Sequence, residues 1–436
     1  MIKVAFYINN NSISNIDCTS ILDSNPGIGG TEYLFYYTVY KLQLRSECTL
    51  NITLLTSSEC KLPQGYKYQM VGSKTEAIEY CIKNNIKVLV VKYEEKDYFP
   101  NIFSRITNDI KIYIWAHNII PNHILTIIAK TKSIRKIINV GKEQLDLYRD
   151  HLAFNKSTYI YNSINIKSIK FYQQHSIPFQ QRQNEITYLG SLVPIKGFHL
   201  LAEAWPNILK AYPDAHLNII GSGNVYGKAQ LGKYGIAEEN YEKVFMPYLT
   251  NSNGEILPSV TFYGKLGEEK NKILAKTKIG VPNPSGYSET FCLSAIEMEL
   301  YGCRIVTKKY VGFLDTVPSS GGVLFKHENA LATTIIKELQ QKENNLYNET
   351  YNFIYNNFNT DKIISEWCKV LIDDSYINDN KIVNPQYNFK NLREKNRKVK
   401  SFLPFGFLLP TIDNYITFLK KYFHFFQLKI YISHYV

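Results

Sequence analysis

The sequence has few cysteines and none of the pairings that small secreted or zinc-binding proteins use. Its seven cysteines, at positions 18, 48, 60, 81, 292, 303 and 368, are odd in number, widely spaced and free of any C-x-x-C pair. This pattern argues against a disulfide framework or a zinc site and favours a reducing compartment. The first residues, MIKVAFYINN, lack the basic segment and cleavage site of a secretory signal. We therefore expect a cytoplasmic protein.

Three further features are missing. No internal repeat of 20 to 50 residues is visible, and no D-x-D pair of carboxylates occurs, so we expect no bound metal ion and no resident cofactor. The apolar runs near the C-terminus are broken by Pro404, Gly406, Pro410, Lys420 and Lys421. They are therefore shorter than the roughly 20 apolar residues that a bilayer-spanning helix needs.

Length and charge indicate a two-domain globular protein with a basic tail. The chain has 436 residues, of which 45% are hydrophobic and 20% charged, and this length exceeds that of most single hydrophobic cores. Of the net charge of +12, a share of +8 falls within residues 381–436. Nucleic-acid binding is the weakest interpretation of this charge, because the basic residues cluster with apolar segments and no recognised module is present.

The apolar pattern alternates between short β-branched runs and helical stretches, which indicates βαβ units and parallel sheets. We expect an N-terminal Rossmann-like domain at 1–172, a Gln-rich linker at 172–184 and a second Rossmann-like domain at 185–350. A closing helix within 351–375 and the tail at 381–436 follow. The predicted fold is therefore α/β, with two doubly wound domains that face one cleft.

The segment PNPSGYSETFCLSAIEMELYGCRIV, at 282–306, has the strongest chemical pattern. We expect a helix over 290–301, capped by Ser288 or Glu289 and followed by Gly302 in a left-handed conformation. The free N–H groups of Thr290, Phe291, Cys292 and Leu293 would then face the cleft, where they could bind a phosphate.

Two glutamates of this segment can face one ligand. Glu289 and Glu297 are separated by seven residues, and on a helix they differ by roughly 80° at about 100° per residue. Carboxylates accept paired hydrogen bonds from vicinal hydroxyls, so the two could hold different sugars of one ligand. Glu299 is expected to be a solvated helix charge.

This segment resembles the E-x7-E element of the retaining GT-B glycosyltransferases of family 4. The resemblance implies that Glu289 contacts the donor sugar and Glu297 the ribose of the nucleotide. It also implies that the backbone amides from Phe291 to Leu293 contact the diphosphate.

A second segment, YLGSLVPIKGFHLLAEAWPNIL at 188–209, resembles the strand, G-R-x-x-x-x-K-G loop and helix of the same family. The resemblance implies that Lys196 neutralises the diphosphate, and Gly190 would let the backbone approach it. The chain departs from the family at Ser191, where the family has an arginine. Lys265 is a hypothetical replacement for that charge.

Three segments of the predicted N-terminal domain resemble further elements of the family. The run GIGGTE at 27–32, with Gly29 and Gly30, is similar to the glycine loop beside the donor phosphate and the acceptor. His117 ends the predicted strand IYIWAHN, where the family keeps a histidine near the donor sugar. The run YNSINI around Asn162 and Ser163 resembles a hinge marker of the family.

The resemblance implies a retaining, metal-independent hexosyltransferase with Glu289, His117 and Lys196 as its catalytic residues. The donor would be a nucleotide diphosphate sugar and the acceptor a glycan or lipid-linked molecule of bacterial surface polysaccharide synthesis, such as lipopolysaccharide. The basic, aromatic tail would bind the anionic inner face of the membrane or pack back on the N-terminal domain. A GT-B sugar-nucleotide epimerase and a non-catalytic sugar-nucleotide-binding subunit remain open alternatives.

Overall fold

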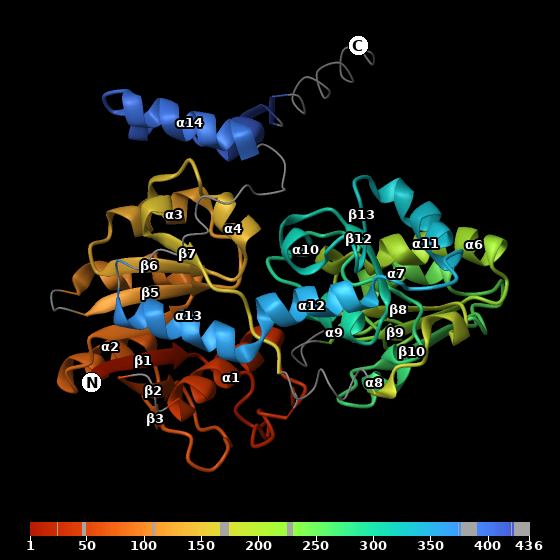
Figure 1. The fold of residues 1–436 in the computed structure, drawn as a ribbon, viewed down its shortest axis with the longest axis horizontal. Helices are drawn as coiled ribbons and strands as arrows, with labels where there is room; N and C mark the ends of the chain where they lie inside the picture. The colour runs from red at the N-terminus through yellow and green to blue at the C-terminus, as the bar shows by residue number, and fades with distance from the viewer. Residues whose placement is uncertain are drawn as a thin grey trace.

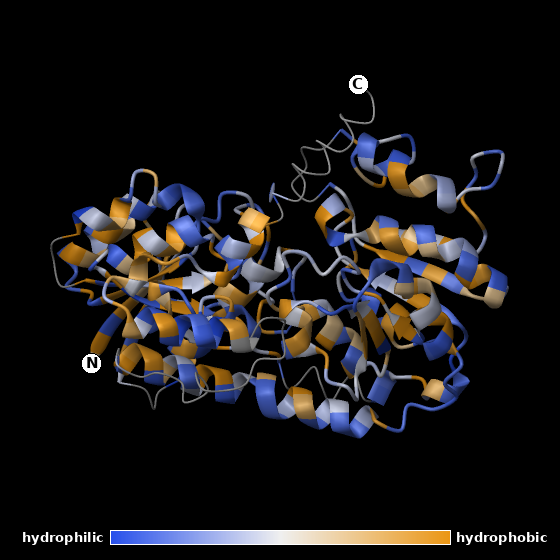
Figure 2. Ribbon diagram, turned by 90° about the horizontal axis from the view of Figure 1, so that it is seen from above, coloured by the Kyte–Doolittle hydropathy of each residue, from blue (hydrophilic) through white to orange (hydrophobic). Residues whose placement is uncertain are grey.

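The computed structural model describes residues 1–23, 25–45, 49–106, 110–165, 174–224, 230–373, 375, 390–419 and 421–422. Within these residues the chain forms two parallel sheets, each flanked by helices (Figure 1). Most of these helices carry apolar residues on one side and polar residues on the other, as expected of helices that cover a sheet (Figure 2).

The first sheet has seven described strands in the order β3-β2-β1-β4-β5-β6-β7, all parallel. The strands are β1 (Ile2–Ile8), β2 (Leu50–Thr56), β3 (Tyr68–Met70), β4 (Val88–Lys92), β5 (Lys111–Ala116), β6 (Ile134–Asn139) and β7 (Ser157–Tyr159). The helices around it are α1 (Gly30–Leu44), α2 (Lys74–Lys83), α3 (Asn122–Lys130) and α4 (Lys142–Asp146). The central strands read as nearly continuous apolar runs because helices cover both faces of the sheet.

The second sheet has six described strands in the order β10-β9-β8-β11-β12-β13, also parallel. The strands are β8 (Glu185–Leu189), β9 (His216–Ile220), β10 (Val260–Gly264), β11 (Ile279–Gly280), β12 (Arg304–Lys308) and β13 (Gly322–Phe325). The helices around it are α6 (Phe198–Ala211), α7 (Glu239–Phe245), α8 (Lys270–Leu274), α9 (Leu293–Leu300), α10 (Val311–Thr316) and α11 (Leu331–Leu339).

Both sheets repeat one connection order, so the predicted pair of doubly wound halves is confirmed. In each sheet the first three strands follow one another toward one edge, and the fourth strand lies on the other side of the first. The strand order therefore reverses between β1 and β4 in the first sheet and between β8 and β11 in the second, and each of these positions is a switch point. Ligands of such sheets bind beyond the carboxyl ends of the strands at that point. The short elements β3, β7, β13, α3 and α10 were not predicted.

Two chain segments connect the halves. The first lies between β7 and β8, and the second is formed by α12 (Tyr347–Phe358) and α13 (Thr360–Ile372). One closing helix is predicted within 351–375; α13 lies in that range, whereas α12 begins before it. The two segments meet where the Ile164 N–H donates to the Phe358 carbonyl (2.8 Å). Trp367 of α13 then packs on Trp115, with ring centroids 4.7 Å apart, so α13 belongs to the first core.

The basic helix α14 (Lys390–Phe402) lies on the first half beside α3 and α4 (Figure 1). A 3₁₀ turn, η9 (Gly406–Leu408), and a helical stretch at 412–419 follow it. The part of the predicted tail at 381–389 and 423–436 lies outside the described residues. No helix in the described ranges combines the length and the apolar character that crossing a membrane requires.

Two residues differ from what the sequence pattern indicates. Glu299 of α9 is not a solvated charge but a buried side chain, and this burial raises its pKa well above the usual range of a glutamate. Cys368 of α13 is disulfide-bonded, whereas Cys18, Cys60, Cys81, Cys292 and Cys303 are free thiols. In both cases sequence spacing could not reveal which face of a helix meets a neighbour.

Candidate functional site

A cavity of about 700 Å³ lies between the two halves at their switch points. Its walls come from the start of α1, the ends of β4, β5 and β8, and the loop that leads into α9. The predicted site residues that line it are Gly29, Gly30, His117, Gly190, Ser191, Lys196, Glu289, Thr290, Phe291, Cys292, Leu293 and Glu297. Segments far apart in the sequence thus meet at one cavity.

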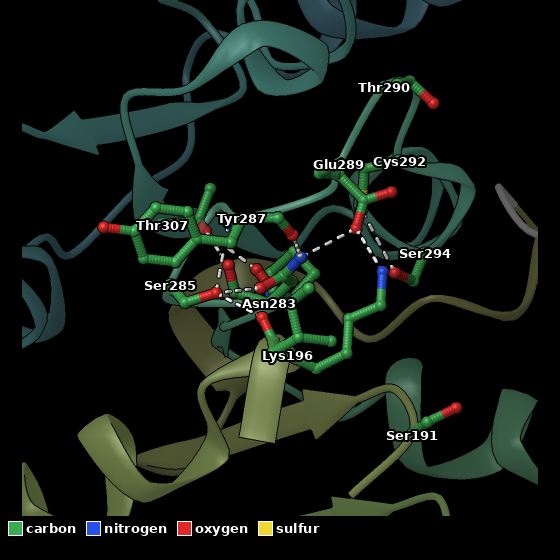
Figure 3. A network of polar contacts seen from close by, with 12 residues as sticks. Ser191, Lys196, Asn283, Ser285, Tyr287, Glu289, Thr290, Cys292, Ser294 and Thr307 are labelled. Atoms are coloured by element: carbon green, nitrogen blue, oxygen red, sulfur yellow. Dashed lines mark hydrogen bonds and ion pairs between the residues drawn. The ribbon is translucent and has the colours of Figure 1, made fainter. Parts of the chain in front are cut away.

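Glu289 is held by a polar network on the second half (Figure 3). Its Oε2 atom accepts hydrogen bonds from the Lys196 ammonium (2.8 Å) and from the side-chain amide of Asn283 (2.9 Å). Burial disfavours the charged form of Lys196, but the adjacent carboxylate of Glu289 outweighs it and raises the pKa of the lysine. The second carboxylate oxygen of Glu289 points away from the network in Figure 3.

Glycines fix the two loops that carry this pair. Gly197, which directly follows Lys196, has a left-handed backbone (φ 67°), and a Cβ atom there would lie 2.7 Å from the Ser285 nitrogen. Gly312 of α10 packs against the loop from the other side and donates its N–H to the Glu289 carbonyl (3.0 Å). A side chain at either glycine would therefore displace the catalytic candidates.

The helix after Glu289 begins later than predicted. α9 starts at Leu293 with Cys292 as its N-cap, and neither Ser288 nor Glu289 caps it. Ser288 instead has a left-handed backbone (φ 58°), which turns the loop before the helix can begin. The unpaired N–H groups of the first turn therefore belong to residues from Leu293 onward, rather than from Thr290.

Two helices begin at this cavity. Gly29 is the N-cap of α1, and a Cβ atom on the next residue, Gly30, would lie 3.7 Å from the Leu293 side chain at the start of α9. Helix N-termini carry partial positive charge and free N–H groups. The cavity is therefore a favourable place for an anion such as a phosphate.

The second glutamate of the motif pairs with a lysine that was not predicted. Lys270 of α8 lies 3.1 Å from both carboxylate oxygens of Glu297. Lys265, the hypothetical replacement for the family arginine, does not line the cavity, whereas Lys270 does. Ser191 lines the cavity without joining the network around Glu289 (Figure 3).

A third ion pair and a neutral histidine form the wall on the first half. Lys92, at the end of β4, lies 3.0 Å from Glu32 of α1. His117 is almost fully buried, and burial together with the charge of Lys92 lowers its pKa to about 3. Its Nε2 atom has no hydrogen-bond partner among the described residues. A neutral imidazole with one unpaired ring nitrogen therefore lies at the wall of the cavity.

Direct contacts join the two walls of the cavity. The Thr290 hydroxyl donates to the His117 carbonyl (2.5 Å). Asp315 of α10 accepts from the Glu143 N–H (2.8 Å) and from the Tyr161 hydroxyl (2.9 Å) of the first half. Burial and the neighbouring Glu143 raise the pKa of Asp315 to about 7.

Sequence reasoning missed Lys92, Lys270 and the role of Glu32, because each becomes a candidate only through its partner across the fold. Lys92 could have been found from its position at the end of a predicted strand, which is the signal that marked His117. Within the described residues no group of three or more His, Cys, Asp or Glu side chains is arranged to hold a metal ion.

Residues 183–341, which contain the whole second sheet, match the family described as glycosyl transferases group 1. A comparison with curated protein sequences gave no match.

Solved structures share the fold of both halves. HepE of Anabaena, in complex with UDP and glucose, has a TM-score of 0.57 at 14% identity and covers 85% of this chain and 100% of its own. A glycosyltransferase from Rickettsia africae has a TM-score of 0.62 at 11% identity, covering 86% and 98%. The catalytic domain of starch synthase IV from Arabidopsis thaliana, bound to ADP and acarbose, has a TM-score of 0.60 at 11% identity, covering 86% and 99%. The fold is therefore that of the GT-B glycosyltransferases.

Proposed function

We propose, from the premise that residues 183–341 form a glycosyl transferases group 1 domain, that the protein moves a hexose from a nucleotide diphosphate sugar to an acceptor. The observation that carries the proposal is the set of three lysine–glutamate pairs that line one cavity at which two helices begin. A sugar nucleotide offers what such pairs bind, namely phosphate oxygens for the lysines and hydroxyls for the carboxylates.

When the donor binds, its phosphates and hydroxyls replace the partners in the lysine–glutamate ion pairs of the cavity. Its diphosphate binds Lys196 and Lys270, and the N–H groups at the start of α9 complete the phosphate site. Glu289 and Glu297, released from their lysines, accept hydroxyls of the donor sugar and of the ribose. Lys270 supplies the positive charge that the family arginine would give at Ser191, so the two lysines can neutralise the diphosphate without a metal ion.

The transfer proceeds with retention of the anomeric configuration. The bond between the sugar C1 and the diphosphate oxygen breaks, and a bond between C1 and the acceptor oxygen forms on the same face. The proton of the acceptor hydroxyl passes to the departing diphosphate. Lys196 and the α9 N–H groups stabilise the charge that develops on that leaving group, and the neutral His117 contacts the sugar from the opposite wall.

The acceptor is a glycan or a lipid-linked molecule of bacterial surface polysaccharide synthesis, and the protein works at the cytoplasmic face of the membrane. The resemblance of the motifs to family 4 enzymes and the basic, aromatic tail support this part of the proposal.

The test is release of nucleotide diphosphate from a panel of UDP-, GDP- and ADP-sugars, with NMR of the sugar product to read its anomeric configuration. Wild type should act on one donor with retention, and Glu289→Gln should be slower by about 100-fold or more. Glu203→Gln, which changes an exposed glutamate of α6, is the control. Conversion of a sugar nucleotide to a stereoisomer without nucleotide release would instead identify an epimerase.

A further inference from the structure

The helix α14 meets the first half through charged and polar side chains. Arg393 is 1% exposed and lies 2.9 Å from Asp413 and 3.8 Å from Asp146 of α4. Asp150 accepts hydrogen bonds from the Asn396 amide and from the Ile412 N–H, both at 2.7 Å. The docking side of α14 is therefore ionic.

An apolar stripe lies on the outward side of the same helix. Leu392, Val399 and Phe402 are exposed, at spacings that keep them on one stripe together with the exposed Lys395. A helix on the surface of a globular protein normally buries its apolar stripe and exposes its charges. In α14 the apolar stripe is instead exposed, while Arg393 is buried against the first half.

The residues after α14 extend this apolar side. Phe405, Phe407 and Leu408 are exposed in and beside η9, and Tyr415, Phe418, Leu419 and Tyr422 are exposed on the following helical stretch. Apart from Met1, the most exposed large apolar side chains of the described residues all lie here: Phe402 (85%), Phe405 (72%), Leu408 (72%) and Phe418 (66%). We call this set of side chains, from Leu392 to Tyr422, the C-terminal apolar face.

We propose that the C-terminal apolar face lies on an anionic lipid bilayer and holds the first half of the molecule against it. Residues 390–422 carry eight Lys and Arg against two acidic residues, and Lys395, Lys398 and Lys421 are exposed beside the apolar side chains. Basic residues next to exposed aromatic and aliphatic side chains suit the boundary between head groups and acyl chains.

Charge complementarity favours a membrane over a second copy of the chain. Two copies that met through this face would bring two basic segments together, and that repulsion would oppose association. An anionic bilayer satisfies the lysines and the apolar side chains at the same time. The contacts of Arg393, Asn396 and Lys400 with α4 and Asp150 fix the face to the first half. Membrane binding would bring the proposed donor site close to a lipid-linked acceptor, and in this respect the inference rests on the proposed function.

The test is co-sedimentation of the full chain with vesicles of phosphatidylcholine alone or mixed with phosphatidylglycerol, without any sugar nucleotide. Wild type should bind the mixed vesicles and lose binding in high salt. The double variant Phe405→Ser/Phe418→Ser should bind at least about tenfold more weakly, and so should Lys395→Glu/Lys398→Glu. The controls Phe99→Ser/Tyr248→Ser and Lys337→Glu/Lys342→Glu, which change exposed residues elsewhere, should bind as wild type does.

Equal vesicle binding by wild type and the two test variants would overturn the inference. So would the absence of vesicle binding by wild type together with a dimer in solution that Phe405→Ser/Phe418→Ser dissociates. Thermal stabilisation by nucleotide diphosphates, measured on the same samples, reports on the proposed donor site separately. Loss of vesicle binding with intact nucleotide binding also shows that a variant is folded.

Discussion

At the scale of single residues, Lys196 links the two parts of the proposed donor site. It lies at the cavity, 2.8 Å from Glu289, and this carboxylate raises its pKa, so it is charged before a ligand enters. Charge-assisted hydrogen bonds contribute about 1.5–3 kcal/mol. We therefore expect Lys196→Ala to weaken nucleotide diphosphate binding about 10- to 100-fold in isothermal titration calorimetry.

The matched control for Lys196→Ala is Lys243→Ala, because Lys243 also pairs with a glutamate on the second half but is exposed on α7. Equal affinities of the two variants for every nucleotide diphosphate would remove Lys196 from the phosphate site.

His117 gives a prediction about pH. Burial and the charge of Lys92 lower its pKa to about 3, so its ring should remain neutral throughout the range in which an ordinary histidine titrates. In NMR spectra recorded from pH 7.5 down to pH 5, the ring signals of His117 should keep the shifts of a neutral imidazole. The signals are assigned by their loss in His117→Gln, and a titration near pH 6.5 would contradict the geometry.

Site residues separated widely in the sequence could be predicted only where a motif marked them. Glu289, Glu297 and Lys196 stand in recognisable patterns, and the structure brings all three to one cavity. Lys270 and Lys92 have no local signature, because what distinguishes them is a glutamate 27 or 60 positions away. Glu299 was misjudged for the same reason, since its burial depends on the packing around α9.

At the scale of elements, α10 and α4 form a contact across the cleft that should respond to pH. Asp315 binds its proton more tightly in the folded state than in the unfolded state, because burial raises its pKa from the ordinary value near 4 to about 7. The stability that the protonated carboxyl gives is therefore lost as pH rises through this window. Relative to Asp315→Asn, the free energy of unfolding of wild type should fall by about 2 kcal/mol between pH 5 and pH 7.

Urea denaturation of both proteins at pH 5, 6, 7 and 8 measures this difference. It should become constant above about pH 8, where Asp315 is ionised in both states. A difference that stays the same from pH 5 to pH 8 would show that Asp315 does not titrate in the fold.

Elements with a clear apolar pattern in the sequence were predicted well. Element boundaries that are set by tertiary packing were not. β1 and β2 coincide residue for residue with the β-branched, apolar runs IKVAFYI and LNITLLT of the sequence. The start of α9 was placed three residues early, because Ser288 and Glu289 are good capping residues by type. The left-handed backbone of Ser288 and the contact of Gly312 with the loop, which delay the helix, are set by the packing of α10.

At the scale of the whole molecule, the arrangement of the halves explains why the site is shared. Each sheet offers a switch point, and the segments that contain α12 and α13 hold the two switch points face to face. The groups proposed to bind the diphosphate come mainly from the second half, while the first half contributes Glu32, Lys92 and His117 to the cavity. Acceptor binding is therefore expected on the first half, which is also the half that carries the C-terminal apolar face.

The most direct test of the central claim is thermal stabilisation of wild type and Glu297→Ala by a panel of nucleotide diphosphates and sugar nucleotides. A ligand that binds only the folded state raises the melting temperature. At a ligand concentration of 100 times its Kd, the free energy of unfolding increases by about 2.7 kcal/mol. The account predicts a shift with the nucleotides of one base in wild type and its loss or strong reduction in Glu297→Ala. No shift with any nucleotide, or an equal shift in both proteins, would contradict a donor site between the two halves.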